Sequence, residues 1–324
     1  MAITRPRRSA PAPRSVEQRA EAQASPWKLG GLSVAELSRR VWAQINSDEV
    51  FDRGAALSYY FLFSLFPTLL FLTTLLGLLP IPQLMAELLN YMDEVLPGDA
   101  ASLIRKTLDE IVSGARGGLL SIGAVAALWS ASAGVMSMVT ALNVVYDVDD
   151  NRPWWKRRLL AIGLTVALSL LIITAMVLLV FGGTLGERLG GWGQFFWNIV
   201  QWPVAVFCAL FGIALVYYAA PAVRQRWRWL TPGSTFALVA WIGMSLGLRF
   251  YVSHFDNYSV TYGSIGGAML LLLWLYLTGV ALLTGAEINA EIEAAAAQRG
   301  VPDAKDKGER VPGEREAQAA RRAS

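Results

Sequence analysis

The sequence is poor in the side chains on which most catalytic and metal-binding chemistry depends. Its 324 residues include one cysteine, Cys208, and one histidine, His254. A single cysteine excludes an internal disulfide and a cysteine-based zinc site, and a single histidine excludes a cluster of histidine ligands. The chain also has no G-x-x-x-x-G-K-[ST] phosphate loop and no H-E-x-x-H motif. We therefore expect a protein that is not an enzyme and holds no metal or cofactor.

Charged residues are also scarce. They make up 16% of the chain, against about 25% in ordinary soluble domains. Hydrophobic residues account for 54%, and there are twelve tryptophans. This composition is typical of a membrane protein whose chain crosses the bilayer several times.

Long apolar runs define the predicted spans. Ile265 to Ala286 contains no charged residue, and as a helix of about 1.5 Å per residue it reaches roughly 33 Å, the hydrocarbon thickness of a bilayer. Similar runs recur along the chain, so we predict an all-α protein with six transmembrane helices. The predicted spans are about 54–79, 118–145, 159–181, 199–220, 234–252 and 265–286.

The distribution of positive charge predicts the topology. With six spans and the N-terminus inside, the inside segments hold 23 of the 28 Lys and Arg residues and the outside segments hold four. Cytoplasmic segments of membrane proteins carry such an excess of Lys and Arg. We therefore predict that both termini lie in the cytoplasm.

Three regions follow from these patterns. Residues 1–32 are predicted to be a disordered basic cytoplasmic tail, residues 33–293 a six-span membrane domain, and residues 294–324 a charged, largely disordered cytoplasmic tail. Ser33 and Glu36 have the spacing of a capping box, ahead of an amphipathic helix that we expect in the membrane interface. Residues 83–116 are expected to form two further amphipathic helices outside the bilayer core.

Polar residues inside the spans are the candidate functional side chains, because such groups must face other helices or a wet cavity. The candidates for a substrate path are Tyr59, Tyr60, Ser64, Asn143 and Arg249 within the spans, with Tyr258 and Tyr262 in the predicted loop at 253–264. For Arg249, Tyr258 and Tyr262, structural roles that involve no substrate remain open. The tyrosines suit an aromatic belt at the outer interface, and Arg249 can snorkel outward or pair with Asp256.

Proline and glycine positions predict local helix geometry. Pro67 is a kink site within the first span. Two pairs have the spacing at which small residues let helices pack closely: Gly243 with Gly247, and Gly263 with Gly267.

Several segments together resemble the YihY/BrkB family of bacterial inner-membrane proteins. They are GAALSYYFLFSLFP at 54–67, RWRWLTPG at 226–233, and the long block from Tyr251 to Asn289. Leu142-Asn143 before Tyr146, with Arg152-Pro153 after it, also fits the family's pattern. The resemblance covers about residues 35–293 and leaves out both tails.

The resemblance implies a protein of about six spans. Some family members are linked to envelope integrity or serum resistance, and a relative is tied to the traffic of lipid A-type glycolipids across the inner membrane. The family's former label, ribonuclease BN, is regarded as a misassignment, and the lack of clustered histidines and carboxylates in this chain agrees with that view.

Two hypotheses of different classes remain. The first is an inner-membrane protein that moves or accommodates an amphipathic, anionic, lipid-like substrate. The second is a structural envelope protein with no transport cycle, in which the polar residues of the spans hold helices together. The expected partners are membrane lipids and such a substrate, with a homo-oligomer or other envelope proteins also open; no nucleic acid is expected.

Overall fold

The computed structural model describes residues 25–77, 102, 106, 120–188, 190–223, 230–254, 258–301 and 304–309. Across these residues the chain is helical, without strands. The predicted amphipathic helices within 83–116 lie almost entirely outside the described residues.

Six of the described helices are long and apolar enough to cross a membrane, which confirms the predicted number. They are α3 (Val50–Gly77), α6 (Leu120–Val145), α7 (Trp154–Arg188), α8 (Gly191–Ala219), α9 (Pro232–His254) and α10 (Tyr258–Gln298). Each contains most or all of one predicted span.

The helices are longer than the predicted spans at several ends. The stretch 182–198 between two predicted spans is mostly helical, because α7 continues to Arg188 and α8 begins at Gly191. The predicted loop at 253–264 is likewise short, since α10 begins at Tyr258. Hydropathy marks the apolar part of a helix, and a helix that leaves the hydrocarbon region with polar or glycine residues continues beyond that mark.

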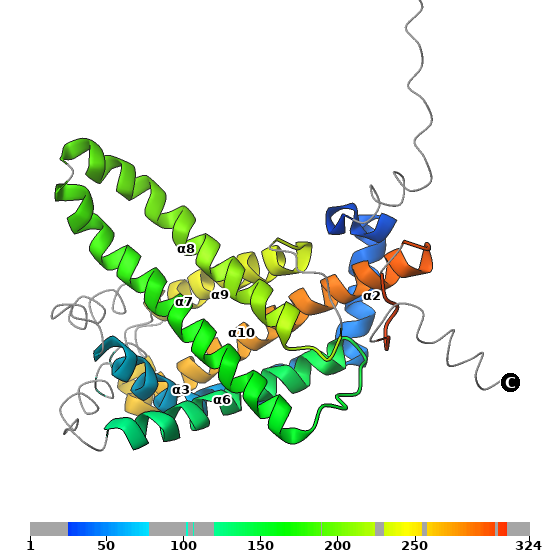
Figure 1. Cartoon of the computed structure of the whole chain (residues 1–324), viewed down its shortest axis with the longest axis horizontal. Helices are drawn as coiled ribbons and strands as arrows, with labels where there is room; N and C mark the ends of the chain where they lie inside the picture. The colour runs from blue at the N-terminus through cyan, green and yellow to red at the C-terminus, as the bar shows by residue number, and fades with distance from the viewer. Residues whose placement is uncertain are drawn as a thin grey trace, which may run out of the picture.

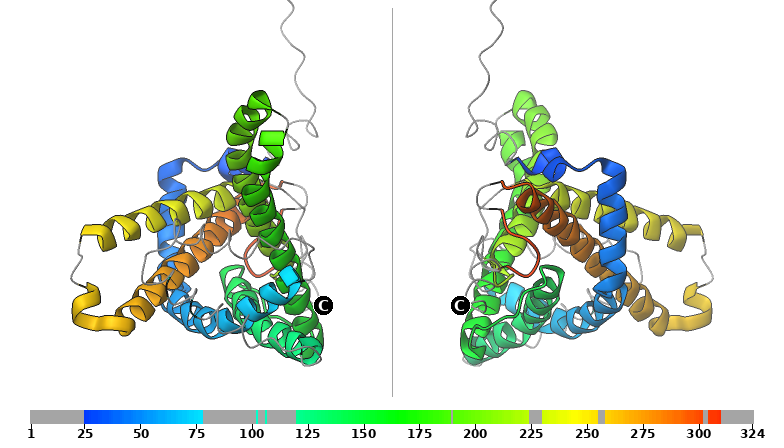
Figure 2. Two further views of the ribbon diagram at one scale, coloured as in Figure 1. Left: turned by 90° about the vertical axis from the view of Figure 1, so that its left-hand side faces the viewer. Right: turned by 90° about the vertical axis from the view of Figure 1, so that its right-hand side faces the viewer.

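The six long helices form three hairpins of consecutive helices, α3/α6, α7/α8 and α9/α10. Neighbouring hairpins also touch, through α10 and α3, α6 and α7, and, less extensively, α8 and α9. In the views of Figures 1 and 2, α7 and α8 lie side by side and extend away from the other four helices. The hairpins therefore share contacts at one end and diverge toward the other.

The apolar core lies at the shared end. Buried members come from the start of α3, the end of α6, the end of α8 and the C-terminal half of α10: Val50, Leu57, Leu142, Val145, Tyr217, Ala220, Leu283 and Ala286. Burial of such side chains at one end fixes the helices relative to one another there.

The helix α2 (Val34–Ser47) precedes the first span. Its predicted cap is confirmed, since the Ser33 hydroxyl accepts a hydrogen bond from the Glu36 amide at 3.2 Å. Its apolar face is divided. Leu37, Val41 and Ile45 are buried in the core that α10 shares, whereas Val34 and Trp42 remain exposed at 69% and 59%.

Both ends of the described chain meet at this shared end. The last part of the predicted N-terminal tail is ordered: Pro26–Gly31 forms a 3-10 turn, η1, that packs against α10. Gly30 has a positive φ of 59°, and a side chain there would collide with the Ile292 carbonyl. Arg299 donates a hydrogen bond to the Gly30 carbonyl.

The predicted C-terminal tail is also partly ordered. α10 runs on to Gln298, and the segment 304–309 folds back so that the Gly308 amide donates to the Tyr146 carbonyl at 3.2 Å. Pro26–Gly31 and the segment 304–309 therefore contact the helices of the shared end, and local composition does not reveal these contacts.

Candidate functional site

The predicted polar face of the first span separates into an exposed and a buried part. Tyr59 and Tyr60 are 55% and 46% exposed, and their rings meet edge to face with centroids 5.5 Å apart. The Tyr59 ring also lies 4.6 Å from that of Phe63. These residues form an exposed aromatic surface on α3, outside the helix contacts.

Ser64 has a different environment. It is buried, and its hydroxyl donates to the Phe61 carbonyl of its own helix at 3.1 Å. A Cβ placed on Gly134 of α6 would lie 2.5 Å from the Ser64 oxygen. Ser64 therefore belongs to a close contact between α3 and α6, where only glycine fits opposite it.

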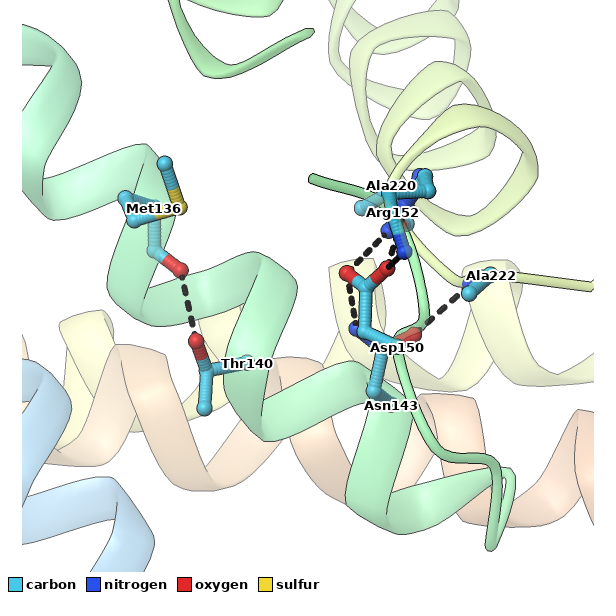
Figure 3. A network of polar contacts seen from close by, with 7 residues as sticks. All are labelled: Met136, Thr140, Asn143, Asp150, Arg152, Ala220 and Ala222. Atoms are coloured by element: carbon cyan, nitrogen blue, oxygen red, sulfur yellow. Dashed lines mark hydrogen bonds and ion pairs between the residues drawn. The ribbon is translucent and has the colours of Figure 1, made fainter. Parts of the chain in front are cut away.

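Asn143 joins three parts of the chain near the end of α6 (Figure 3). Its side-chain nitrogen donates to Asp150 Oδ2 at 3.1 Å, and its oxygen accepts the Ala222 amide at 2.7 Å. Arg152 binds both oxygens of Asp150 at 2.7 Å each and donates to the Ala220 carbonyl at 3.0 Å. This network ties α6 and the loop after it to the end of α8.

The charge of Asp150 is stabilised within that network. Burial alone would raise its pKa, but the hydrogen bonds from the Arg152 side chain and backbone, with the charges of Arg152 and Arg157, hold the pKa of Asp150 below its usual value. The stabilisation is therefore present when the carboxylate is ionised and is lost as the pH falls through the lowered pKa.

A second junction, between α9 and α10, was not predicted. Gly233 and Gly285 approach so closely that a Cβ on either would collide with the carbonyl oxygen of the other. Asn289 of α10 accepts the Gly233 amide at 3.0 Å and donates to the Thr231 hydroxyl at 3.0 Å. The hint in the sequence is the Thr231-Pro-Gly run. Its glycine lies in the first turn of α9, next to Asn289 of α10.

Part of α9 is left uncovered in the membrane-spanning region. Trp274 and Trp241 mark its covered face, through hydrogen bonds that join Trp274 to Ser245 at 3.0 Å and Trp241 to Thr278 at 3.2 Å. Elsewhere on the helix Leu246 and Phe250 are 60% and 64% exposed.

The predicted glycine pair lies on the uncovered part. A Cβ on Gly243 or Gly247 would have no atom within 4 Å among the described residues. This pair therefore makes no close packing with the described residues. Gly267 is buried, and the surroundings of Gly263 lie outside the described residues.

Arg249 is exposed on α9, within the candidate span Pro232–Val252. Its predicted partner Asp256 lies outside the described residues. Tyr258 and Tyr262, predicted in a loop, have their backbones in the first turns of α10, and their side chains also lie outside what is described. Pro67 lies inside α3, which continues through it to Gly77.

The contact made by Arg158 was not predicted. Arg158, in the first turns of α7, lies over the Trp129 ring of α6 at 4.0 Å and donates to the Trp129 carbonyl. Nearby, Trp154 and Trp155 are exposed at 68% and 48%, with Lys156 over the Trp155 ring at 5.3 Å. Aromatic and basic side chains together are typical of a membrane–water interface.

The path residues whose side chains are described fall into two groups. Ser64 and Asn143 serve helix contacts, whereas Tyr59, Tyr60 and Arg249 lie on exposed surfaces of α3 and α9. Within the described ranges, no three His, Cys, Asp or Glu side chains are grouped so that they could hold a metal ion.

Comparisons with known proteins agree on the family. The model of a family described as "Virulence factor BrkB" matches residues 41–309. A "Putative ribonuclease-like protein YfkH" of Bacillus subtilis is 38% identical over 258 residues, which cover 78% of this chain and 93% of that protein.

More distant relatives carry only a membrane description. A "UPF0761 membrane protein" of Xanthomonas campestris is 26% identical over 272 residues, covering 80% of this chain and 61% of that protein. One from Stenotrophomonas maltophilia is 26% identical over 262 residues, or 79% of this chain and 60% of that protein. No solved structure matches.

Proposed function

Since the chain belongs to the BrkB family of membrane proteins, we propose that it handles or translocates an amphipathic, anionic, lipid-like substrate in the bacterial cytoplasmic (inner) membrane and thereby supports envelope integrity. On this proposal it is not an enzyme and needs no cofactor. Its partners are membrane lipids and the substrate.

The uncovered part of α9 is the observation that carries the proposal. Gly243 and Gly247 leave open space beside the helix, and Arg249 is exposed close to the end of the same candidate span. Glycines without neighbours leave room along a helix for an acyl chain. An arginine near the end of a span can bind a phosphate with two parallel hydrogen bonds.

The arrangement of the hairpins supports the same reading. The helices are joined firmly at the end that holds the apolar core, while α7 and α8 extend away from α9 and α10 toward the other end (Figures 1 and 2). An elongated, amphipathic substrate needs access from the side of the bilayer, and helices that are joined mainly at one end are suited to such access.

We also propose that the shared end of the hairpins lies in the cytoplasm. Both described ends of the chain meet there, as an even number of spans requires. The predicted inside segments adjoin this end and carry 23 of the 28 Lys and Arg residues.

The alternative is a structural envelope protein without a transport cycle, acting alone, as a homo-oligomer or with other envelope proteins. It is favoured by Ser64 and Asn143, since both side chains are committed to contacts between or beside helices. Polar groups in such positions hold transmembrane helices together without touching a substrate.

Reconstitution tests the proposal. The purified chain is placed in liposomes with a fluorescent anionic phospholipid, and movement between leaflets is followed by dithionite quenching. We expect protein-dependent movement that falls roughly 10- to 100-fold in Arg249→Ala, because loss of a charge-assisted hydrogen bond costs about 1.5–3 kcal/mol, and that falls less in Arg249→Lys.

Arg39→Ala is the matched control, because Arg39 is an exposed arginine on α2, outside the candidate spans. It removes the same charge and should leave movement unchanged. If no protein-dependent movement is seen with several lipids and ion gradients, the structural alternative stands instead.

A further inference from the structure

A buried group of charged side chains joins three segments at the shared end of the hairpins. Lys307, from the segment 304–309, places its Nζ 3.2 Å from Glu287 Oε2 and 3.3 Å from Glu291 Oε1, both on α10. The same nitrogen lies 4.0 Å from Oδ2 of Asp48, at the corner between α2 and α3.

The group is shielded from solvent. The Glu287 side chain is fully buried, and those of Glu291, Asp48 and Lys307 are 10%, 14% and 14% exposed. The group contains three carboxyl groups and one ammonium, that of Lys307. It therefore carries two uncompensated negative charges when every carboxyl is ionised.

Two neighbouring cations, Lys305 and Arg53, interact with other groups. Lys305 forms an ion pair with Glu293 at 2.5 Å. Arg53 of α3 donates through Nε to the backbone carbonyl of Asp48 at 2.7 Å. Buried carboxylates that lack a cation are strongly disfavoured, and such groups take up a proton instead.

Two oxygen atoms identify where a proton fits. Glu287 Oε1 and Asp48 Oδ2 are both buried, and neither has a hydrogen-bond donor among the described residues. Both carboxyl groups face the same ammonium, since Lys307 Nζ lies 3.2 Å from Glu287 Oε2 and 4.0 Å from Asp48 Oδ2. An ionised carboxylate only accepts hydrogen bonds, whereas a protonated carboxyl group also donates one.

We propose that Asp48 and Glu287 form a proton-binding site, closed by Lys307, in which the two carboxyl groups share one proton. The shared proton links the α2–α3 corner to α10, and Lys307 compensates one of the two negative charges that remain on the three carboxyl groups. Loss of the proton restores the second uncompensated charge to the buried group and weakens the link between the corner and α10. The site is thus a proton-sensitive latch.

The first test is infrared spectroscopy of the full-length protein in lipid nanodiscs. A protonated carboxyl gives a carbonyl stretching band that carboxylates lack. We expect such a band near neutral pH, its loss on titration at higher pH, and its absence in Glu287→Gln. Glu293→Gln is the matched control. It removes a carboxylate of the same helix, but one that is already paired with Lys305.

Lys307→Met gives a second, independent readout if Glu287→Gln folds poorly. Removing an opposite charge that lies within about 4–6 Å raises the pKa of a carboxyl by about 1–3. The band of Lys307→Met should therefore persist to a pH higher by one to three units than in the wild type.

Stability should follow the same titration. A proton bound more tightly by the folded state stabilises it at low pH, and that stabilisation is lost as the pH rises. We expect the melting temperature of the wild type to fall between about pH 6 and pH 9, where buried glutamates titrate, and Glu287→Gln to flatten that fall.

The proposal is overturned if the band is unchanged in Glu287→Gln, or if its titration does not move in Lys307→Met. Neither readout depends on lipid movement. A protein that binds the proton but moves no lipid would support the latch and contradict the proposed function. A protein that moves lipid without binding the proton would contradict the latch and leave the proposed function standing.

Discussion

Replacing Gly233 by alanine should weaken the junction of α9 and α10, whereas the same replacement at Gly243 should not. A Cβ on Gly233 would collide with the Gly285 carbonyl and lie 2.6 Å from Asn289 Oδ1. The nearest obstacle is a backbone oxygen of another helix, so a side-chain rotation cannot relieve the overlap and the two helices must separate. At Gly243 the added carbon meets open space.

The magnitude follows from comparing the two variants. Inserting a carbon into a well-packed contact costs about 1–3 kcal/mol. The preference of helices for alanine over glycine, about 0.5–1 kcal/mol, acts in the same direction at both positions. Because the helix preference contributes to both variants, it largely cancels in the difference between their free energies of unfolding. We therefore expect Gly233→Ala to be less stable than Gly243→Ala by about 1–3 kcal/mol.

Unfolding by a denaturing detergent in mixed micelles, followed by tryptophan fluorescence, measures this difference. Gly247→Ala provides a second control on the same helix, since nothing lies within 4 Å of its Cβ position among the described residues. Equal stability of Gly233→Ala and Gly243→Ala would refute the close approach of the two helices. Destabilisation by Gly247→Ala would instead show that this part of α9 is covered by something other than the described residues.

Three other predictions concern the junctions at Asn143 and Ser64. Asn143→Leu should lower the free energy of unfolding by about 1–3 kcal/mol, because it leaves the Ala222 amide unpaired. Thr140→Val loses only a hydrogen bond to the Met136 carbonyl of its own helix (Figure 3) and should have little effect in the same unfolding assay. Because the pKa of Asp150 is held low, its contribution to stability should be lost below about pH 4, and Asp150→Asn should reduce the fall in melting temperature on acidification. Gly134→Ala should destabilise the α3–α6 contact, and Ser64→Ala should recover part of the loss in a double-mutant cycle, since the Ser64 oxygen lies 2.5 Å from the added carbon; independent, additive effects would contradict that contact.

The spans were predictable because a bilayer imposes a minimum length of apolar helix, and that length is visible in one stretch of sequence. Contacts between spans are not local in this way. Gly243 and Gly247 share a face of α9, yet their spacing does not reveal whether a helix covers that face. Gly233 and Gly285 have no shared pattern, because each lies on a different helix and their approach depends on how the helices cross.

The same limit applies to charge. Around Lys305 and Lys307 the sequence has the composition of a solvated tail. Lys307 is mostly buried because α10 continues to Gln298 and places Glu287 and Glu291 on a surface that the segment can reach. Such a contact joins residues 16 to 20 positions apart across a reversal of the chain, and no periodicity within the segment reports it.

The choice between transport and scaffolding now depends on fewer residues than the sequence suggested. Loss of activity in an Asn143 or Ser64 variant is uninformative, because both side chains support the fold and either hypothesis predicts damage. Tyr59, Tyr60 and Arg249 are exposed on the spans, so their replacement should leave the free energy of unfolding within about 0.5 kcal/mol of the wild type. A stable Arg249→Ala protein that no longer moves lipid therefore supports transport, whereas a stable protein with intact envelope function excludes Arg249 from a substrate path.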